Sequence, residues 1–353
     1  MKRVIVALLI LGGSIILIGV NFGRAFKANG RAREKAEERI NRTFEVTPGG
    51  LLSVDVEGGS VDVKPSDSNK VYVELYRRFE AGSADEARSL LERYPVSFTQ
   101  SGNSIYIESQ GPNGRYRKQM ELRISVPHNF NVDLKTSGGN IAVDGIQGTV
   151  KSSTSGGNLR FTKIEGPVRG STSGGSINVK DIEGEAIVKT SGGSINVTNV
   201  SENVVAHTSG GSITANRVGG KLEAKTSGGS LNFEDIAGEI EGQSSGGSVT
   251  ARFLKPIEAN CRLETSGGSV NLFLPENSRF DLDAEANSGH VVTEFPIAIT
   301  LQGKLDGSSL RGRVNGGGAV VYCRTSGSNI NLKKTPPTVG SLVDSVKKQA
   351  CAN

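Results

Sequence analysis

The sequence of 353 residues predicts an all-β fold: a single-chain β-solenoid (β-helix) with 18-residue coils, preceded by an N-terminal transmembrane helix. Three observations support this fold class. Copies of Thr-Ser-Gly-Gly, one of them Ser-Ser-Gly-Gly, begin at a constant interval at positions 136, 154, 172, 190, 208, 226 and 244, with a last copy at 265. Aliphatic and polar residues alternate between the copies, and residues 4–23 carry no charge. A fixed period of this length is typical of solenoids, in which each repeat is one coil stacked on the next.

One coil shows how the repeat builds two strands. In the coil 174–191, Ile177 and Val179 alternate with polar neighbours, which is the pattern of a strand with one buried face. After a polar corner and a turn at Glu183-Gly184, residues 186–190 alternate again and predict the second strand. The inward positions are not evenly spaced by six, which excludes a left-handed hexapeptide helix. The turns also lack the Asp of calcium-binding nonapeptide coils.

The paired glycines predict the sharp corners of the coils. A corner stacked on an identical corner favours positive φ and leaves no room for a Cβ atom, so glycine is expected there. The threonine before each pair is expected to form a ladder along the stack. The structural turn glycines predicted in this way are Gly138, Gly139, Gly156, Gly157, Gly174, Gly175, Gly192, Gly193, Gly210, Gly211, Gly228, Gly229, Gly246, Gly247, Gly267 and Gly268.

Residues 1–25 are predicted to be a transmembrane anchor. The run 4–23 is uncharged and rich in Ile, Leu and Val, and as a helix it is about 30 Å long, the thickness of a bilayer core. A signal peptide is the alternative, with a weak cleavage site at 23–25. Residues 26–43 are predicted to form a basic juxtamembrane helix, facing either anionic lipid headgroups or solvent. Residues 1–43 hold nine Lys/Arg and three Asp/Glu, and the remaining chain holds 32 and 33. Basic residues on both sides of the run leave its topology open.

The rest of the chain divides by its pattern. Residues 44–127 are predicted to be a β-rich N-terminal cap that covers the open edge of the stack, because an exposed edge invites end-to-end aggregation. A capping box at Ser83-Ala-Asp-Glu86 predicts one short helix ending at Arg93. Regular coils are expected over 128–276, degenerate C-terminal coils over 277–334 and a flexible tail over 335–353. The strands predicted in the cap are 52–63, 71–79, 96–100, 104–108 and 120–126.

Several segments carry a resemblance to a known family. They are the opening Phe44-Glu-Val-Thr-Pro-Gly-Gly, the Val126-Pro127 before the repeats, the Thr-Ser-Gly-Gly-Ser-Ile coils and the closing Gly-Gly-Gly-Ala-Val-Val-Tyr. Over residues 44–333 the chain resembles a bacterial family of putative adhesins with a Gly-rich β-strand repeat domain of unknown function. The resemblance implies the solenoid fold and a place in the cell envelope, and some relatives act in envelope-stress signalling. It brings no catalytic residues with it.

Side chains able to do chemistry are scattered. Asp181 and Asp235 share a column but lie three coils apart, and Glu165 and Glu183 are adjacent corner carboxylates expected to be solvated. No spacing of His, Cys and Asp resembles a metal site. We therefore predict no catalytic, cofactor-binding or metal-binding residues, no cofactor and no enzyme activity. Nucleic acid is not an expected partner, because the solenoid is neutral and lacks Trp.

The histidines and cysteines have no evident common site. His128, His207 and His290 are far apart in the repeat order, and an exposed position is expected for His207. Cys261 and Cys323 fall in strand patterns and are expected to be small core or surface residues. Cys351, in the tail, is the one cysteine that could form an intermolecular disulfide if the chain is exported.

A surface-binding ladder is the remaining candidate site. Outward polar residues recur once per coil, and such a ladder suits weak multivalent contact with a surface glycan or an envelope protein. The alternative is that Asn and Ser ladders only satisfy one another and stabilise the stack. The ladder residues are Asn178, Asn196, Thr214, Asn232 and Thr250.

The predicted function is that of a non-catalytic, membrane-anchored β-solenoid of the cell envelope, an adhesin-like structural or binding module. An envelope-stress sensor or regulatory partner of membrane proteins is the alternative hypothesis, and a polysaccharide-active β-helix enzyme is the third. The solenoid is expected to be exported, to the periplasm or the cell surface, behind a single membrane pass through residues 4–23. The ligand, the handedness of the coil, the cleavage of the anchor and the oligomeric state stay open.

Overall fold

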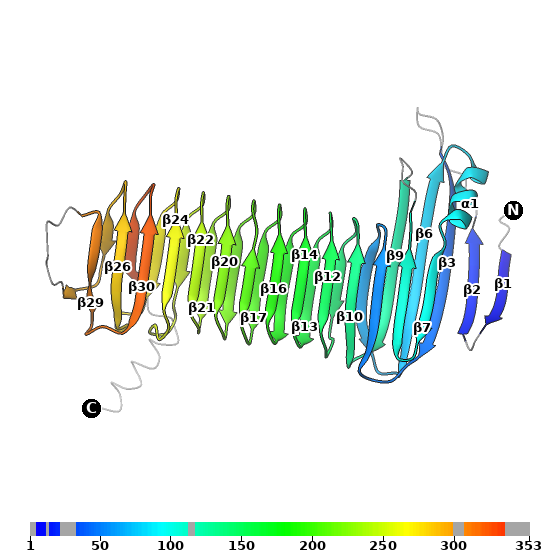
Figure 1. The fold of residues 1–353 in the computed structure, drawn as a ribbon, viewed down its shortest axis with the longest axis horizontal. Helices are drawn as coiled ribbons and strands as arrows, with labels where there is room; N and C mark the ends of the chain where they lie inside the picture. Colours follow the sequence, from blue (N-terminus) through cyan, green and yellow to red (C-terminus); the bar gives the residue numbers. More distant parts are fainter. Residues whose placement is uncertain (1–4, 12–13, 22–32, 112–116, 299–306, 336–353) are drawn as a thin grey trace, which may run out of the picture. The chain divides into compact units, whose positions relative to one another are not determined.

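The computed structural model describes residues 5–11, 14–21, 33–111, 117–298 and 307–335, with the backbone alone for 5–11 and 14–21. The chain forms two compact units, residues 1–193 and residues 194–353, and the described part of each is built from strands, with one short helix in the first (Figure 1). The elements of the first unit are β1 (Ile5–Leu11), β2 (Ser14–Asn21), β3 (Glu34–Glu45), β4 (Gly50–Val56), β5 (Ser60–Ser66), β6 (Lys70–Ala81), α1 (Ala84–Arg93), β7 (Val96–Ser101), β8 (Ser104–Ser109), β9 (Arg117–Pro127), β10 (Phe130–Thr136), β11 (Ile141–Asp144), β12 (Val150–Thr154), β13 (Leu159–Glu165), β14 (Val168–Thr172), β15 (Ile177–Glu183) and β16 (Ala186–Thr190). The elements of the second unit are β17 (Ile195–Val200), β18 (Val204–His207), β19 (Ile213–Val218), β20 (Leu222–Thr226), β21 (Leu231–Ile236), β22 (Ile240–Ser244), β23 (Val249–Arg252), β24 (Cys261–Thr265), β25 (Val270–Leu274), β26 (Phe280–Ala286), β27 (Val291–Thr293), β28 (Ile297–Ala298), β29 (Ser309–Val314), β30 (Ala319–Thr325) and β31 (Ile330–Lys334).

Each coil contributes one strand to each of two sheets, which we call sheet A and sheet B in both units. In the first unit, sheet A includes β11, β13 and β15, and sheet B includes β10, β12, β14 and β16. Within this unit, neighbouring coils pair in parallel, strand with equivalent strand, so that Leu159 lies opposite Ile177 and Val150 lies opposite Val168. The predicted β-solenoid with 18-residue coils is therefore confirmed.

The stack order departs from the chain order at the N-terminal end of the first unit. Strands β4 and β5 pair in parallel with β10 and β11 of the first regular coil. On their other side they pair in parallel with β8 and β9, which follow them in the chain. Residues 50–66 thus form a coil inside the stack, although the sequence placed them in the cap. The single strand predicted over 52–63 is interrupted at Glu57-Gly58-Gly59, where Gly58 and Gly59 have positive φ.

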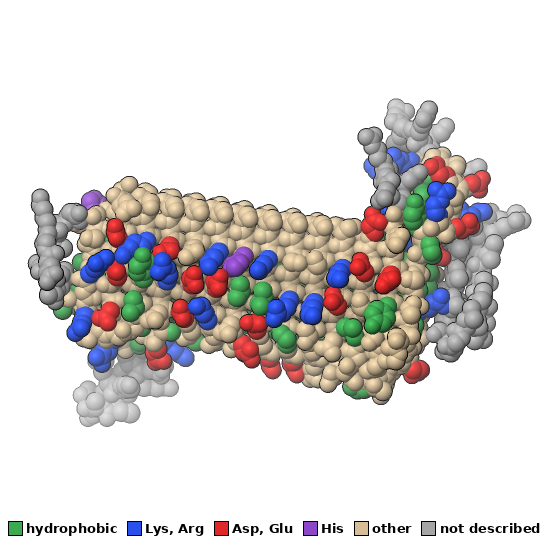
Figure 2. All heavy atoms as spheres, in the orientation of Figure 1, with side chains coloured by type: hydrophobic (Ala, Val, Ile, Leu, Met, Phe, Trp, Pro, Cys, Tyr) green, Lys and Arg blue, Asp and Glu red, His purple; other side chains and the backbone are tan. Residues whose placement is uncertain are grey.

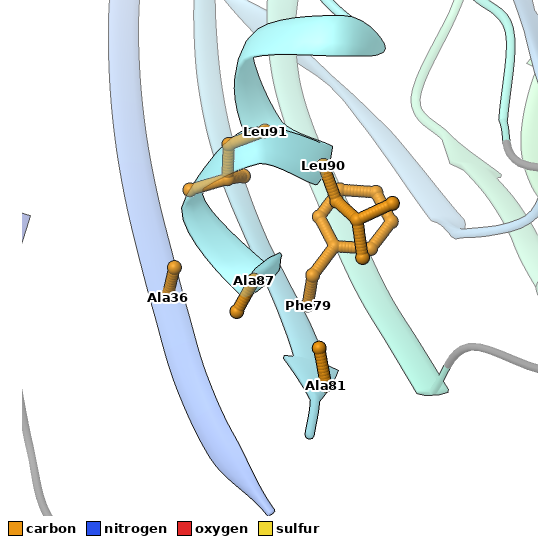
Figure 3. Close-up of a cluster of buried hydrophobic side chains, with 6 residues drawn as sticks. All are labelled: Ala36, Phe79, Ala81, Ala87, Leu90 and Leu91. Carbon is orange, nitrogen blue, oxygen red and sulfur yellow. The ribbon is translucent and has the colours of Figure 1, made fainter. Parts of the chain in front are cut away.

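The outer part of this end is an antiparallel layer. Strand β6 pairs with β9, and β3 pairs with β6 along its whole length. The helix α1 covers this layer, where Ala87, Leu90 and Leu91 pack on Ala36 of β3 and Phe79 of β6 (Figure 3). The predicted N-cap is confirmed, since Ser83 Oγ accepts a hydrogen bond from Glu86 N. The return bond of a capping box is displaced by one residue, because Glu86 accepts from Gly82 N and not from the N-cap Ser83 N.

A buried arginine ties these three elements together. Arg77 of β6 is 4 % exposed, and its guanidinium donates to Glu38 of β3 and to the Tyr94 carbonyl oxygen. It also donates to the carbonyl oxygen of Leu91, 3.0 Å away, and so satisfies the C-terminal end of α1. A buried charge is tolerated only with partners of this kind.

The helix predicted over 26–43 is wrong for the described part of that segment, because residues 34–45 form β3. Pairing with β6 and burial of Ala36, Ile40 and Phe44 on one face outweigh the helix propensity of its Glu, Lys and Arg residues. Residues 5–11 and 14–21, expected to be helical, are the strands β1 and β2, which pair with each other and with β3. Ile and Val favour strands where a sheet edge is available. Within the described ranges no helix is long and apolar enough to span a membrane.

The second unit repeats the parallel stack and also ends with a change of order. Its sheet A runs β17-β19-β21-β23-β25-β31-β27, and sheet B runs β18-β20-β22-β24-β30-β26-β29-β28. The coil β30-β31 therefore stacks directly on β24-β25, and the earlier coil β26-β27 lies outside it. The degenerate C-terminal coils predicted over 277–334 are present, but in the reverse of the expected order. The tail beyond residue 335, Cys351 and the cleavage site at 23–25 lie outside the described residues.

The core between the sheets is filled by complementary pairs of large and small side chains. Phe161 of β13 is fully buried opposite Gly170 of β14, where an added Cβ atom would lie 2.7 Å from the Phe161 ring. In the second unit, Phe233 and Gly242 repeat this arrangement at the same distance. The coil that follows Phe161 carries Val179 and Val188 in these columns. The volume of the core layer is therefore kept while its side chains change.

The corner glycines need a different explanation from the one the sequence suggested. None of the predicted Ser-Gly-Gly glycines is among those with positive φ. The second glycine of each pair lies against the corner of the previous coil instead, and a Cβ atom on Gly175 would lie only 1.9 Å from the Gly157 carbonyl oxygen. Steric crowding requires glycine here. The positive φ values of the regular coils fall at the opposite corner. They belong to Lys163, Asp181, Asn199, Arg217 and Asp235 and to Gly145, Gly148, Gly166 and Gly184.

Candidate functional site

The threonine column inside the coils is structural. Thr172 Oγ1 donates to the Gly157 carbonyl oxygen of the previous coil at 2.9 Å, and it accepts from Gly175 N at 3.3 Å. The same two bonds recur at Thr154, Thr190 and Thr226. Each hydroxyl is buried and uses both its donor and its acceptor, so this predicted ladder holds the corners together.

The polar column beside the glycines is also used by the stack. Ser212 N donates to Ser194 Oγ, and Ser230 N donates to Ser212 Oγ at 3.1 Å. In the first unit, Asn158 takes the same role, because Ser176 N donates to its Oδ1 at 2.8 Å. The side chains of this column satisfy backbone donors of the next coil. The self-stabilising alternative therefore describes this column well.

The Asn and Thr column on the outer face of sheet A behaves differently. Asn178 is exposed on β15 of the first unit. In the second unit, Asn196, Thr214, Asn232 and Thr250 lie directly opposite one another on β17, β19, β21 and β23. Among the residues that the structure describes, none of these five side chains has a hydrogen-bond partner. We call the four residues of the second unit, together with Asn271 and Asn331, the outer ladder.

The last two residues of the outer ladder escaped the sequence analysis. Asn271 lies opposite Thr250, and Asn331 lies opposite Asn271, to whose Oδ1 it donates at 2.9 Å. The insertion before Thr265 shifts Asn271 out of the regular count. The exchange of coil order brings Asn331 next to it. The repeat spacing would have identified Asn271 if the 18-residue count had been restarted at Thr265.

The chemistry of the outer ladder is that of a neutral hydrogen-bonding surface. Each amide offers two donors and a carbonyl acceptor, and each hydroxyl offers one donor and two acceptors. Successive groups are about 4.8 Å apart, which is the spacing of strands in a sheet. On the same strands, a flanking column holds the Asn216 to Glu234 hydrogen bond of 2.9 Å and the Arg252 guanidinium stacked 4.5 Å from the Phe273 ring. The ladder is thus bordered by fixed side chains.

The outer face of sheet B in the second unit carries paired charges. Glu223 accepts hydrogen bonds from Lys225 at 2.8 Å and from His207 at 3.1 Å, and Lys225 also lies 3.2 Å from Glu241. The bond from Lys225 lowers the pKa of the Glu223 carboxyl, and the same bond raises the pKa of Lys225. In the space-filling view, basic and acidic side chains lie mixed over the strands, beside a band that is neither charged nor hydrophobic (Figure 2).

A groove of about 490 Å³ lies at the insertion of the second unit. The coil that contains it, between Ser244 and Thr265, is longer than the regular coils, and its extra residues form a loop over 253–259. Phe253 and Ile257 of this loop are buried, whereas Leu254, at the position where other coils bury an aliphatic residue, is 43 % exposed. This groove was not predicted from the sequence, although the longer interval before Thr265 indicates the insertion that forms it.

The remaining reactive groups do not converge. Glu165 and Glu183 are exposed and lie opposite each other on β13 and β15, and Gln147 donates to Glu165 at 2.8 Å. Cys261 and Cys323 are buried free thiols, and burial raises the pKa of Cys323 to about 12. Among the described residues, no group of three or more His, Cys, Asp or Glu side chains could hold a metal ion.

The three histidines lie at the surface. His207 is half-buried in the charged face rather than fully exposed, and His290 is exposed. His128 is exposed and lies 3.2 Å from Asp67. Each histidine thus has a separate environment.

The comparison with known families decides where this fold belongs. The family model described as Toastrack DUF4097 matches residues 51–333, which is most of the chain. The chain belongs to the Toastrack DUF4097 family. This confirms the resemblance that the sequence analysis drew from the Thr-Ser-Gly-Gly coils and their flanking segments. The matched range includes the inserted coil β4-β5 and most of β31, so the Toastrack DUF4097 domain comprises the stacked coils of both units.

Two solved structures are similar to this Toastrack DUF4097 chain. One is a putative cell adhesion protein from Clostridium sporogenes, with 12% sequence identity, a TM-score of 0.17 and coverage of 84% of this chain and 99% of that one. The other is a putative adhesin from Bacteroides fragilis, with 12% identity, a TM-score of 0.30 and coverage of 84% and 97%. At these TM-scores neither likeness carries an argument about function. No curated protein matches the chain.

Proposed function

We propose that this Toastrack DUF4097 protein is a non-catalytic binding module of the cell envelope, and that its outer ladder binds a neutral surface glycan. One observation carries the proposal. The threonine and serine columns use their hydrogen bonds within the stack, whereas Asn196, Thr214 and Asn232 are exposed and have no partner among the described residues. Identical groups at a constant spacing give many weak contacts to a repeating polymer, and such contacts add up through effective concentration.

The ligand class follows from the chemistry of the outer ladder. Uncharged amides and hydroxyls pair well with sugar hydroxyls, which are themselves both donors and acceptors. An anionic polymer would find no cation in this column, and a protein partner would be expected to bury large apolar side chains. A linear neutral glycan lying along the column requires neither a cation nor a large apolar side chain.

Membrane anchoring belongs to the same proposal and is supported by the sequence. The uncharged run 4–23 is flanked by Lys2-Arg3 and Arg24 and is long enough to cross a bilayer as a helix. In a bilayer a helix satisfies every backbone group internally, whereas the open hairpin of β1 and β2 would leave unpaired groups in lipid. We therefore propose that this segment is helical when membrane-inserted and holds an exported solenoid at the envelope.

The test is binding of the full chain, in non-ionic detergent, to a panel of immobilised neutral oligosaccharides. Binding of wild type and its loss in the double variant Asn196→Ala/Asn232→Ala is the expected result. Removing two net hydrogen bonds of about 1 kcal/mol each weakens binding about 25-fold. The matched control is Asn69→Ala/Asn287→Ala, which removes two exposed amides outside the ladder and should bind as wild type does.

Four results would count against the proposal. If the protein bound no member of the panel, a neutral glycan would be refuted as the ligand. If both double variants lost the same affinity, the outer ladder would be refuted as the binding site. Release of reducing ends from any polysaccharide would instead support the enzyme hypothesis. If an unrelated membrane anchor in place of residues 1–43 abolished function in cells while glycan binding persisted, a sensor acting through its anchor would be favoured over passive display.

A further inference from the structure

The outer face of sheet B in the first unit contains a recess of about 320 Å³ ringed by cations. Lys135 of β10, Lys151 of β12, Arg169 of β14 and Lys189 of β16 all line it, and all four are exposed. We call these four residues, with the two serines between them, Ser153 and Ser171, the basic recess. None of them belongs to the outer ladder, so the basic recess is independent of the glycan proposal.

The recess arises from the alignment of two columns. In one column, Ser153 and Ser171 lie between Lys135 and Lys189, and their short side chains leave a hollow. In the other column, Lys151 lies directly opposite Arg169. Ser171 donates to Ser153 Oγ at 3.1 Å, so the Ser153 hydroxyl proton is free to donate to a ligand in the hollow. Two cations stand at the ends of the hollow and two along its side.

The cations of the basic recess are poorly neutralised. Among the described residues, Lys135, Lys151 and Lys189 have no hydrogen bond or ion pair through their side chains. Arg169 has only a long contact of 3.9 Å with Glu185. Two acids are near in register, Asp133 opposite Lys151 and Asp55 opposite Lys135, but neither forms an ion pair with its neighbour.

The corresponding face of the second unit shows what neutralised cations look like in this fold. There, Lys225 bridges Glu223 and Glu241, and Arg262 lies 2.6 Å from Glu264. Both basic side chains meet a carboxylate on their own strand or the next one. Cations left without such partners repel one another, and this cost is recovered when an anion binds between them.

We propose that the basic recess binds a linear polyphosphate chain. Strands are about 4.8 Å apart, so Lys135 and Lys189, three strands apart, are separated by about 14 Å at the backbone. One phosphate cannot contact all four cations across that span, but two successive phosphates of a polymer can. Lys and Arg are the side chains that bind phosphate oxygens best.

Two other polyanions fit less well. Single-stranded nucleic acid is bound through aromatic platforms on which the bases stack, and the lining of the recess contains no aromatic residue. An anionic membrane surface is broad and meets protruding side chains, whereas the serine floor lies at the bottom of a hollow. A narrow phosphate chain can reach the Ser153 hydroxyl.

The experiment measures binding of fluorescent linear polyphosphate to the full chain in non-ionic detergent, over a series of salt concentrations. Four engaged cations predict a slope of about −3 for the logarithm of the association constant against the logarithm of salt. The double variant Lys151→Gln/Arg169→Gln should bind about 25-fold more weakly, at about fivefold per cation, with a slope reduced by about half. The matched control Lys180→Gln/Arg160→Gln makes the same charge change on the outer face of sheet A and should bind as wild type.

Each alternative outcome overturns the proposal. Equal losses in the two double variants would mean that net charge, and not the recess, attracts the polymer. Orthophosphate that competes as well as polyphosphate, phosphate for phosphate, would show a single-anion site. Binding to anionic phospholipid vesicles without binding to polyphosphate would show that this face contacts a membrane. Binding to neither would refute the basic recess as a site for polyanions. Identical thermal unfolding of all variants shows that folding is not the cause of a loss.

Discussion

The complementary pair Phe161 and Gly170 provides the sharpest test of the packing described for the coils. Replacing Gly170 with Val puts a Cβ atom 2.7 Å from the Phe161 ring and 3.2 Å from Leu159. Overpacking of this kind costs about 2 kcal/mol. Replacing Phe161 with Val deletes four buried carbon atoms and leaves a cavity, at a cost of about 3 kcal/mol.

Together the two changes should largely cancel. The double variant Phe161→Val/Gly170→Val copies the pair Val179 and Val188 of the next coil, and it contains one carbon atom fewer than wild type. Its expected cost is about 1 kcal/mol, so the coupling between the two positions is about 4 kcal/mol in the favourable direction. Coupling of this size is expected only for side chains in direct contact.

The assay is urea-induced unfolding of the full chain in non-ionic detergent, followed by circular dichroism, with the slope against urea checked for each variant. The control combines Gly170→Val with Phe233→Val, because Phe233 packs on Gly242 and not on Gly170. The control pair should be additive. A double variant Phe161→Val/Gly170→Val that is as unstable as the sum of its single changes would refute the complementary packing.

Three further predictions concern the coils. Thr172→Val should lower the free energy of unfolding by about 2 kcal/mol, because it leaves Gly157 O and Gly175 N without a partner; Thr172→Ser, which keeps the hydroxyl as Ser244 does, should cost much less, and equal losses by urea unfolding would contradict the ladder. Ser152 Oγ is buried without a partner among the described residues, so Ser152→Ala should raise the free energy of unfolding by about 1 kcal/mol and with it the melting temperature. A melting temperature below that of wild type would show that the hydroxyl makes a hydrogen bond. Burial raises the pKa of Cys323 to about 12 and that of Cys261 well above its usual value, so in Cys351→Ser protein neither thiol should react with iodoacetamide until urea unfolds the chain. Because burial raises the pKa of both thiols in the folded state, their contribution to stability is complete below the ordinary thiol pKa of about 8.5 and is lost as the pH rises toward about 12. Unfolding measured over this pH range checks the loss. Rapid labelling of the native protein would contradict both the burial of the thiols and their raised pKa.

The repeat made the regular coils predictable from sequence. Its period fixed the length of each coil, and alternation identified Ile177 and Val179 as inward positions, which the structure confirms. The same logic placed Asn196 and Asn232 on an outward column. The repeat pattern could not show which polar column forms hydrogen bonds within the stack. A side chain does so only if it reaches a backbone donor of the next coil, as Ser212 does and Asn232 does not.

The ends of the stack were less predictable because long-range pairing decides them. Residues 34–43 have helix-forming composition, yet they form β3 because β6 offers a complete partner and the face of Ala36 and Ile40 is buried. The insertion of the coil β4-β5 and the inverted order of β26-β27 and β30-β31 leave no local trace in the sequence. The basic recess was missed for a related reason, since each of its four cations belongs to a different coil and they meet only through the register of four strands.

The central claim is that the solenoid is displayed outside the cytoplasm, where its outer ladder can meet a surface glycan. The direct measurement is protease treatment of intact cells, spheroplasts and lysate, following the fragment 44–334 and allowing for its own resistance to cleavage. The account predicts digestion in intact cells or spheroplasts, before lysis. Protection until the cells are lysed would place the solenoid in the cytoplasm and contradict the account.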